Sequence, residues 1–397
     1  MNNAPLRSPG PSLGTTVASS ASAQLPDYLA SAKPNPRSNR GAWYKNTAPT
    51  YAGIFLWFAF WDRMSGNGLS AGGLGATLLG VVIGALICHF LFFIVPGNLG
   101  MQTGLPLYVV GASTFGAAGS LIMPGFLMGI LQFGWLGVNI YFSSLALAGG
   151  PGGVFVLVCI VWGILAAFVG LKGIQYVAKV ATYLPLIPLA VLLIALARFG
   201  PQATSYTPPA GAGAGGLSAV LMMVAAVVGF FATAGAAGVD ICSNNRDKKD
   251  VSMGGWVGVV IAIIFTAGIS VVAVAGARAT GVLGADDVVL TDALKKSFPG
   301  LSTAMMIGLA IASFPGACFS SFIAANSFKT VMPKVNPFVS VGIGTIVSII
   351  LAITGAAGQL PSVFGLIGAS FGPIVGAMVV DYLLEGGKWA GPRTSGR

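Results

Sequence analysis

The sequence predicts an all-α integral membrane protein with about ten transmembrane helices, arranged as two inverted halves of five. Hydrophobic residues make up 55% of the 397 positions and charged residues only 8%, whereas a soluble domain carries about 25% charged residues. Apolar runs of around 20 residues recur from Ala48 onward, each long enough to cross a hydrocarbon core about 30 Å thick. The runs are continuously apolar rather than alternating, which favours helices over barrel strands.

The expected spans form one transmembrane core over residues 48–386. The polar segment 1–47, rich in Ser, Pro, Asn and Ala, is expected to be a disordered cytoplasmic tail, and residues 387–397 a cytoplasmic C-terminal tail. The ten spans are placed near residues 49–69, 72–95, 119–147, 153–170, 176–198, 217–239, 253–277, 301–327, 337–357 and 361–384.

Basic residues are distributed unevenly between the two sides of this core. With the N-terminus inside, the outer segments hold only Arg198, Arg278, Lys295 and Lys296, and most of the 20 Lys and Arg residues fall on the inner side. This asymmetry predicts cytoplasmic N- and C-termini and an even number of spans. We therefore expect a multi-pass protein of a cell membrane, with the bacterial inner membrane as the favoured location.

Two blocks of five spans, residues 48–199 and 217–386, flank a Pro/Gly/Ala-rich linker. Because five is odd, the second block enters the membrane from the opposite side, which is the plan of many secondary transporters. The first and sixth helices are then expected to be discontinuous, as in the leucine-transporter type of fold. Glycines interrupt both apolar runs, at Gly66 and Gly68 around Asn67 in the first and at Gly229, Gly235 and Gly238 in the sixth.

A polar face runs along the third expected span. Gln132, Trp135, Asn139 and Ser143 are spaced by three, four and four residues, so they share one side of a helix. Such a stripe must face protein or a water-filled cavity. Interhelical hydrogen bonding would explain the two amides alone, whereas an indole between two amides also favours binding of a planar, hydrogen-bonding heterocycle.

Several stretches resemble the nucleobase–cation symporter family, which includes cytosine, uracil, hydantoin and allantoin permeases. The resemblance is carried by "TGLPLYVVGASTFGAAGSLIMPGFLMGILQFGWLGVNIYF", by "GFFATAGAAGVDICSNNR" and by "GPIVGAMVVDYLL", and it spans roughly residues 49 to 386. Members of that family usually continue for two further spans, so the resemblance implies that this chain is truncated before them.

The resemblance also implies a substrate site. Trp135 matches the family's stacking tryptophan, Gln132 the glutamine with which cytosine permeases bind the base, and Asn139 the position of a ligand-binding glutamine in hydantoin and allantoin permeases. Counting nine residues back from Asp240, the sixth-span aspartate, gives Phe231 as the second stacking aromatic. Phe230 takes its place if the register is off by one, and the adjacent Gly229 completes the expected set.

Transport in the resembled family is coupled to sodium or protons, and no other cofactor is implied. Its cation site uses first-span backbone carbonyls and eighth-span hydroxyls, so Ser313 is the expected sodium ligand here and Ser320 and Ser321 are alternatives. The chain departs from the pattern at Pro315 and Gly316, where polar residues are usual, and at Ala310, where cytosine permeases have an asparagine.

Asp62 and Arg63 follow a largely apolar stretch and are expected near mid-membrane, where charges are costly and often functional. Asp62 is interpreted either as a cation ligand or proton acceptor, or as an ion-pair partner of Arg63 that closes a gate or caps a half-helix.

Three functions follow from these patterns. The first is import of a nucleobase or related planar heterocycle, with a cytosine-like substrate ahead of purines; the others are transport of an amine or amino acid held by Asp62, and ligand sensing without transport. The sequence shows neither a phosphate-binding glycine loop nor a metal-ligand cluster, so no motif of this kind predicts an enzyme. The expected partners are a small planar substrate and the lipid bilayer, with neither nucleic acid nor an obligate protein partner.

Overall fold

The computed structural model describes residues 25–172, 181–209, 216–285 and 287–395. Eight helical stretches in this part of the chain are long and apolar enough to cross a membrane. The first of them, Ser65–Thr103, contains parts of two spans, as shown below. Together with the short first-span helices and the apolar helix Pro337–Ile353, these stretches account for the ten spans expected from the sequence.

The chain reverses direction at Gly73 inside α4 (Ser65–Ile87). Gly73 has a φ of 77° and a ψ of −177°, a backbone conformation that favours glycine. A Cβ on Gly68 would lie 2.7 Å from Cγ2 of Thr77, although residues nine apart in a straight helix are separated by about 13 Å. The first span therefore ends before Gly73, and the second continues from it through η3 (Cys88–Phe93) and α5 (Ile94–Thr103).

The first span is broken, but not where its glycines predict. It consists of α2 (Thr47–Leu56), α3 (Phe58–Trp61) and the start of α4, with interruptions at Trp57, whose ψ is 123°, and at residues 62–64. The predicted break at Gly66–Gly68 is wrong, because these residues are helical. Glycine at 66 instead permits close packing, since a Cβ there would lie 2.5 Å from the Cα of Val288.

The sixth span is interrupted near its end. Helix α12 (Leu217–Ala236) runs unbroken through Gly229, and a turn at Ala237 separates it from α13 (Gly238–Cys242). The predicted interruption is thus found beside Gly235 and Gly238 but not at Gly229.

The remaining spans lie close to their expected positions. The third follows Gly116, another non-helical glycine, within α7 (Ala112–Ser120). The described elements are η4 (Leu121–Phe126) and α8 (Leu127–Ala148) for the third span, α9 (Gly153–Lys172), α11 (Leu186–Phe199), α14 (Lys248–Gly255) with η6 (Trp256–Ile261) and α15 (Ala262–Ala279), α17 (Pro299–Val331), α18 (Pro337–Ile353) and α19 (Leu360–Leu384). Part of the fifth predicted span, residues 173–180, lies outside the described residues.

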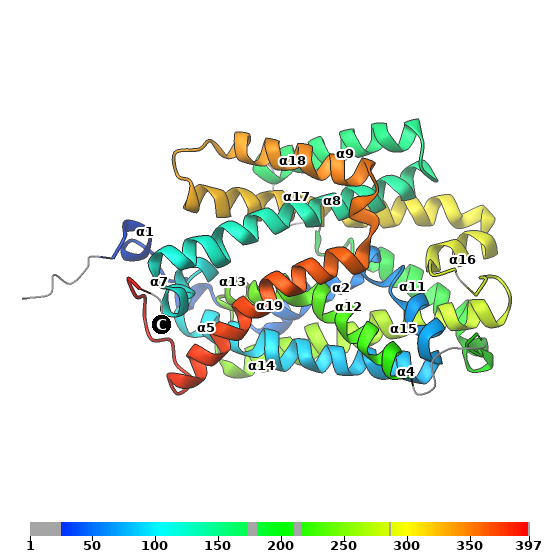
Figure 1. The fold of residues 1–397 in the computed structure, drawn as a ribbon, viewed down its shortest axis with the longest axis horizontal. Helices are drawn as coiled ribbons and strands as arrows, with labels where there is room; N and C mark the ends of the chain where they lie inside the picture. The colour runs from blue at the N-terminus through cyan, green and yellow to red at the C-terminus, as the bar shows by residue number, and fades with distance from the viewer. Residues whose placement is uncertain (1–24, 173–180, 210–215, 286, 396–397) are drawn as a thin grey trace, which may run out of the picture.

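The helices form two sets that meet along the middle of the molecule (Figure 1). Helices α8, α9, α17 and α18 pack on one another, and α4, α12 and α15 form the second set, with α11 and α19 against it. The short helix α1 (Asp27–Ala30) and the C-terminal segment lie at one end of the bundle, which we call the termini end. Helix α16 (Leu290–Ser297) lies at the opposite end.

Residues 25–47 are ordered at the termini end, which corrects the expectation that all of segment 1–47 is disordered. The Tyr28 hydroxyl donates to the Ala117 carbonyl, and the Arg40 guanidinium donates to the Met101 carbonyl at 2.5 Å. Polar side chains and backbone groups of the segment therefore find partners on the bundle, and Leu29 is buried in the hydrophobic core with Leu25 and Tyr28 packed against it. Residues 1–24 lie outside the described residues.

The C-terminal segment follows the same end of the bundle. The Trp389 indole donates to the Val110 carbonyl at 3.0 Å, and the Arg393 amide donates to the Ala112 carbonyl at 3.1 Å. The expected tail 387–397 is thus bound to the hairpin around α7 as far as residue 395.

Candidate functional site

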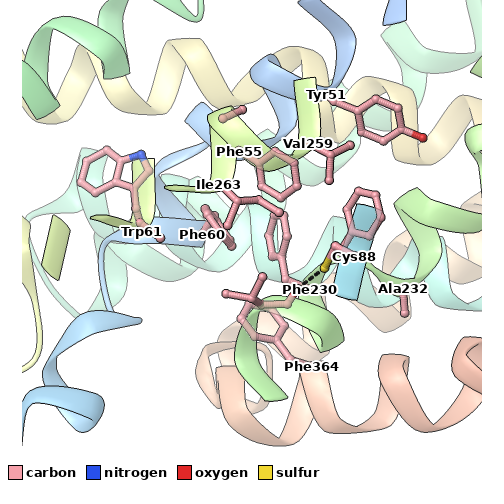
Figure 2. Close-up of a cluster of buried hydrophobic side chains, with 14 of the residues drawn as sticks. Tyr51, Phe55, Phe60, Trp61, Cys88, Phe230, Ala232, Val259, Ile263 and Phe364 are labelled. Atoms are coloured by element: carbon pink, nitrogen blue, oxygen red, sulfur yellow. Dashed lines mark hydrogen bonds between the residues drawn. The ribbon is translucent and has the colours of Figure 1, made fainter. Parts of the chain in front are cut away.

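An aromatic cluster occupies the junction of the two helix sets. The Trp135 ring on α8 lies 5.1 Å from the Phe230 ring on α12 and 6.0 Å from the Phe364 ring on α19. Phe230 lies between Phe55 and Phe364 (Figure 2), at 6.0 and 5.4 Å. Trp57, at the first-span break, completes the cluster 6.0 Å from Trp135. The cluster therefore joins the third, sixth and tenth spans to the interrupted part of the first.

Phe230, rather than Phe231, faces Trp135. Their rings are nearly perpendicular, at 78°, and Phe230 is only 2% exposed. Phe231 has no ring contact with Trp135 among the described residues; its ring stacks on Phe55 at 5.8 Å and lies 5.7 Å from Tyr51. The structure therefore brings the alternative residue of the sequence prediction to the Trp135 ring.

Thr233 holds the Trp135 indole in place and was not predicted from the sequence. Its hydroxyl oxygen accepts a hydrogen bond of 3.0 Å from Nε1 of Trp135. Thr233 lies three residues after Phe230, so both project from one face of α12 towards Trp135. That spacing is the signal that could have identified it.

Gln132 lies one turn before Trp135 and its side chain forms one weak hydrogen bond. Its Nε2 donates to the Met128 sulfur at 3.4 Å, and a thioether is a weak acceptor. The described residues give its amide no other hydrogen bond. Gln132 therefore retains donor and acceptor capacity beside the aromatic cluster.

Asn139, in contrast, forms several hydrogen bonds within the protein. Its Nδ2 donates to the Ser313 carbonyl at 2.8 Å, and its Oδ1 accepts from Nε1 of Trp162 at 3.1 Å and from the Ser143 hydroxyl at 3.4 Å. These bonds connect α8 to α17 and α9 within one helix set. The arrangement favours the interhelical interpretation of Asn139 over its predicted role in ligand binding.

We expect Asn139→Ala to lower the free energy of unfolding by about 1–2 kcal/mol, because interhelical hydrogen bonds in membrane proteins have this upper range. Thermal unfolding of the purified protein measures the change, and ligand titration checks that affinity is retained by the folded fraction. Asn326→Ala is a matched control, because this exposed asparagine on the same helix set makes no side-chain hydrogen bond within the described residues. A large loss of affinity without a loss of stability would contradict the structural role.

Gly229 allows α12 and α19 to cross closely. A Cβ at this position would lie 2.5 Å from the Phe364 carbonyl oxygen, and Gly368 lies on the same crossing. Since Phe364 and the neighbouring Phe230 belong to the aromatic cluster, Gly229 sets the spacing of two of its rings. Its contacts are those of helix packing.

The three predicted cation-site serines all lie on α17. The Ser313 hydroxyl donates to the Leu309 carbonyl at 2.8 Å, and the Ser321 hydroxyl donates to the Ala317 carbonyl at 3.2 Å, both within their own helix. No hydrogen bond joins the Ser320 hydroxyl to the described residues. A hydroxyl that donates to its own helix keeps oxygen lone pairs as acceptors, so all three residues are compatible with a cation ligand.

Asp62 caps a helix from a distant part of the chain. Its carboxylate accepts from the Thr291 amide at 2.7 Å and from the Thr291 hydroxyl at 3.1 Å, and its carbonyl accepts from the Leu290 amide at 2.9 Å. Leu290 and Thr291 begin α16, whose first amides lack partners within the helix. We call this set of contacts the α16 latch.

Arg63 forms no ion pair with this carboxylate within the described part of the chain. Its guanidinium lies 5.3 Å from the centre of the Phe142 ring, within the range of a cation–π contact. A cavity of about 60 Å³ lies beside both residues and is also lined by Lys295 and Asp292. Of the two interpretations of Asp62, the ion pair with Arg63 is thus not formed, and the carboxylate contacts Thr291 in the α16 latch instead. Because the carboxylate is already engaged, the geometry does not favour Asp62 as the anchor for an amine.

Known proteins resemble this chain over most of its length. A family model described as a permease for cytosine/purines, uracil, thiamine and allantoin matches residues 34–388. The chain belongs to this family. Its members among the curated relatives are permeases, so this family member is a multi-pass membrane transport protein and not an enzyme.

The curated relatives are cytosine permeases of Escherichia coli. The protein of strain K12 is 25% identical over 323 residues, which cover 78% of this chain and 70% of the relative, and that of O157:H7 is 26% identical over the same length. The resemblance noted in the sequence is therefore confirmed as family membership.

Solved structures confirm the fold. Mhp1, a nucleobase-cation-symport-1 family transporter, matches in a closed conformation with bromovinylhydantoin bound (TM-score 0.66, 18% identity, 89% of this chain and 81% of that one). Its inward-facing conformation matches with a TM-score of 0.71, at 17% identity over 89% and 79% of the two chains. A manganese transporter from Eremococcus coleocola matches with a TM-score of 0.53, at 16% identity over 87% and 80%.

Proposed function

We propose that this permease is a secondary active transporter that imports a nucleobase or a related planar heterocycle, with cytosine as the first candidate. The observation that carries the proposal is the Trp135–Phe230 ring pair, which bridges the two helix sets with Gln132 one turn away. Aromatic faces with a few placed polar groups are typical of small-molecule sites. The names of the Escherichia coli relatives support cytosine in particular.

Binding between these two rings requires a change in their arrangement. A planar ligand stacked on both faces needs a ring separation of about 7 Å, since each carbon–carbon contact takes about 3.5 Å. The rings are 5.1 Å apart and nearly perpendicular. Because Trp135 and Phe230 belong to different helix sets, relative movement of the sets would open and close the space for the ligand. Such rocking around a fixed site is the basis of alternating access.

We propose that a sodium or proton gradient drives this transport, as the description of Mhp1 as a cation symporter suggests. Ser313 is the first candidate for a sodium ligand, with Ser320 and Ser321 as alternatives, because their hydroxyl oxygens retain acceptor capacity. First-span carbonyls near the Trp57 break would supply the remaining oxygen ligands.

We propose further that the termini end faces the cytoplasm of a cell membrane. Arg246 and Lys248 closely follow Asn244 and Asn245, which contact the N-terminal residues Asn46 and Gly41, whereas Lys295 and Lys296 belong to α16 at the opposite end. Asp247 is exposed, so a cysteine in the variant Asp247→Cys should not be labelled by an impermeant thiol reagent added outside the cell. The four native cysteines are buried and give little background.

The decisive experiment measures uptake of labelled cytosine by purified protein in proteoliposomes, with a sodium gradient, a proton gradient or neither. We expect accumulation that depends on one gradient and is inhibited by unlabelled nucleobases. Saturable binding in detergent without flux would instead favour a sensor, and amine uptake without a response to nucleobases would favour the amine transporter. A ligand at 100 times its dissociation constant stabilises the fold by about 2.7 kcal/mol, so a thermal-shift screen can rank nucleobases beforehand.

A further inference from the structure

The Trp57 indole carries a buried N–H group without a hydrogen-bond partner among the described residues. Four of the six other tryptophans donate this hydrogen to an acceptor: Trp61 to the Leu56 carbonyl, Trp135 to Thr233, Trp162 to Asn139 and Trp389 to the Val110 carbonyl. Buried donors without a partner are rare in native proteins because the missing bond is costly. The unpaired N–H group of Trp57 therefore needs an explanation.

The position of Trp57 supplies one. It forms the break between α2 and α3, where the backbone leaves the helical conformation. Its ring lies 6.0 Å from the Trp135 ring, at an angle of 63°, and 6.2 Å from the Phe230 ring. Because the Trp57 ring is inclined to the Trp135 ring, it would lie beside the edge, rather than the face, of a ligand stacked on Trp135. The carbonyl and ring-nitrogen acceptors of a nucleobase lie on that edge.

We propose that Trp57 is a substrate-binding residue whose Nε1–H donates a hydrogen bond to a carbonyl oxygen on the edge of the bound heterocycle. This inference rests on the proposed function, since it assumes a ligand stacked on Trp135. It assigns the site a hydrogen-bond donor from the first span, in addition to the amide of Gln132 on α8. The site thereby prefers heterocycles with a carbonyl oxygen at that edge.

The test removes the N–H group alone. In the full chain, Trp57 is replaced by 3-benzothienylalanine, which has sulfur in place of the indole N–H, and the same replacement of Trp61 is the matched control. Dissociation constants are measured by calorimetry for cytosine and for 4-aminopyrimidine, which lacks the carbonyl oxygen. Trp57→Phe is the second variant, should the first fold poorly.

We expect the Trp57 variant to bind cytosine about two- to tenfold more weakly, the range of one hydrogen bond, and to bind 4-aminopyrimidine as the wild type does. Its thermal stability without ligand should not fall, because no bond within the protein is lost. The Trp61 variant should instead lose stability and keep the wild-type preference between the two ligands.

Unchanged cytosine affinity in both Trp57 variants, or equal weakening of both ligands, would overturn the inference. So would reduced stability of the ligand-free benzothienyl variant, which would mean that the N–H already contacts a neighbouring ring face. These results leave the proposed function intact, because wild-type binding persists in each of them. Failure of the wild type to bind any nucleobase would overturn the proposed function and this inference together.

Discussion

Trp135→Ala is expected to raise the dissociation constant for cytosine by about 10- to 100-fold. Stacking of a base on an aromatic side chain contributes about 1–3 kcal/mol by alanine substitution, and 1.4 kcal/mol corresponds to a factor of ten. Trp135→Tyr keeps an aromatic face and should recover much of the affinity. Calorimetric titration of purified protein gives the dissociation constants, and uptake into proteoliposomes should fall in the same order.

Loss of a buried indole also destabilises a protein, so the effect on binding needs a control of equal burial. Trp61 is fully buried outside the Trp135–Phe230 pair, and its ring contacts Phe58 at 6.4 Å. We expect Trp61→Ala to lower the melting temperature about as much as Trp135→Ala, with a dissociation constant close to that of the wild type. Similar dissociation constants for the two variants would contradict the placement of the ligand on Trp135.

The spans could be predicted because hydropathy is a local property. The hydropathy of an apolar run depends on its own residues and not on the helices that it packs against. The observed helices accordingly begin and end within a few residues of most predicted limits. The breaks were harder to place. Glycine permits both an interruption and a close helix contact, and at Gly66 and Gly229 the structure uses it for the contact. The main break falls instead at Trp57, a residue type with no tendency to end helices.

The register of the sixth span shows a second limit of sequence reasoning. Phe231 was placed by counting nine residues back from Asp240, as the family resemblance implies, with Phe230 as the alternative. A turn at Ala237 lies between the two positions, so such a count does not fix the direction of a side chain around α12. An error of one residue corresponds to about 100° around a helix, which is enough to exchange Phe231 for Phe230.

The sequence singles out polar residues in apolar stretches but does not indicate their partners. Asn139 and Asp62 stand out in apolar stretches, yet their roles depend on groups that are distant in sequence. Asp62 and Thr291 are separated by 229 positions, and nothing in either segment alone indicates the pairing. Trp135 and Gln132 were easier to assign, because their spacing and the family resemblance both indicated the same side of one helix.

Asp62→Ala is expected to lower the free energy of unfolding by about 2–3 kcal/mol. The substitution removes both side-chain bonds of the α16 latch and leaves the Thr291 amide unpaired at a buried helix N-terminus. A lost N-cap costs about 0.5–2 kcal/mol and a hydrogen bond to a charged group contributes about 1.5–3 kcal/mol. Asp62→Asn keeps an oxygen that can accept from the Thr291 amide, so we expect a smaller loss of about 1 kcal/mol.

Thermal unfolding measures these changes, and hydrogen exchange of residues 290–297 shows whether α16 is released. Asp292→Ala is the matched control, since this neighbouring acid is half-exposed and its ion pair within the described residues is with Lys295, a contact worth at most about 1 kcal/mol. The two Asp62 variants also separate its possible roles. A latch requires an acceptor, so the asparagine variant should retain most cytosine uptake. If Asp62 were the anion that binds an amine or a coupling cation, asparagine would abolish transport as completely as alanine while α16 stayed protected.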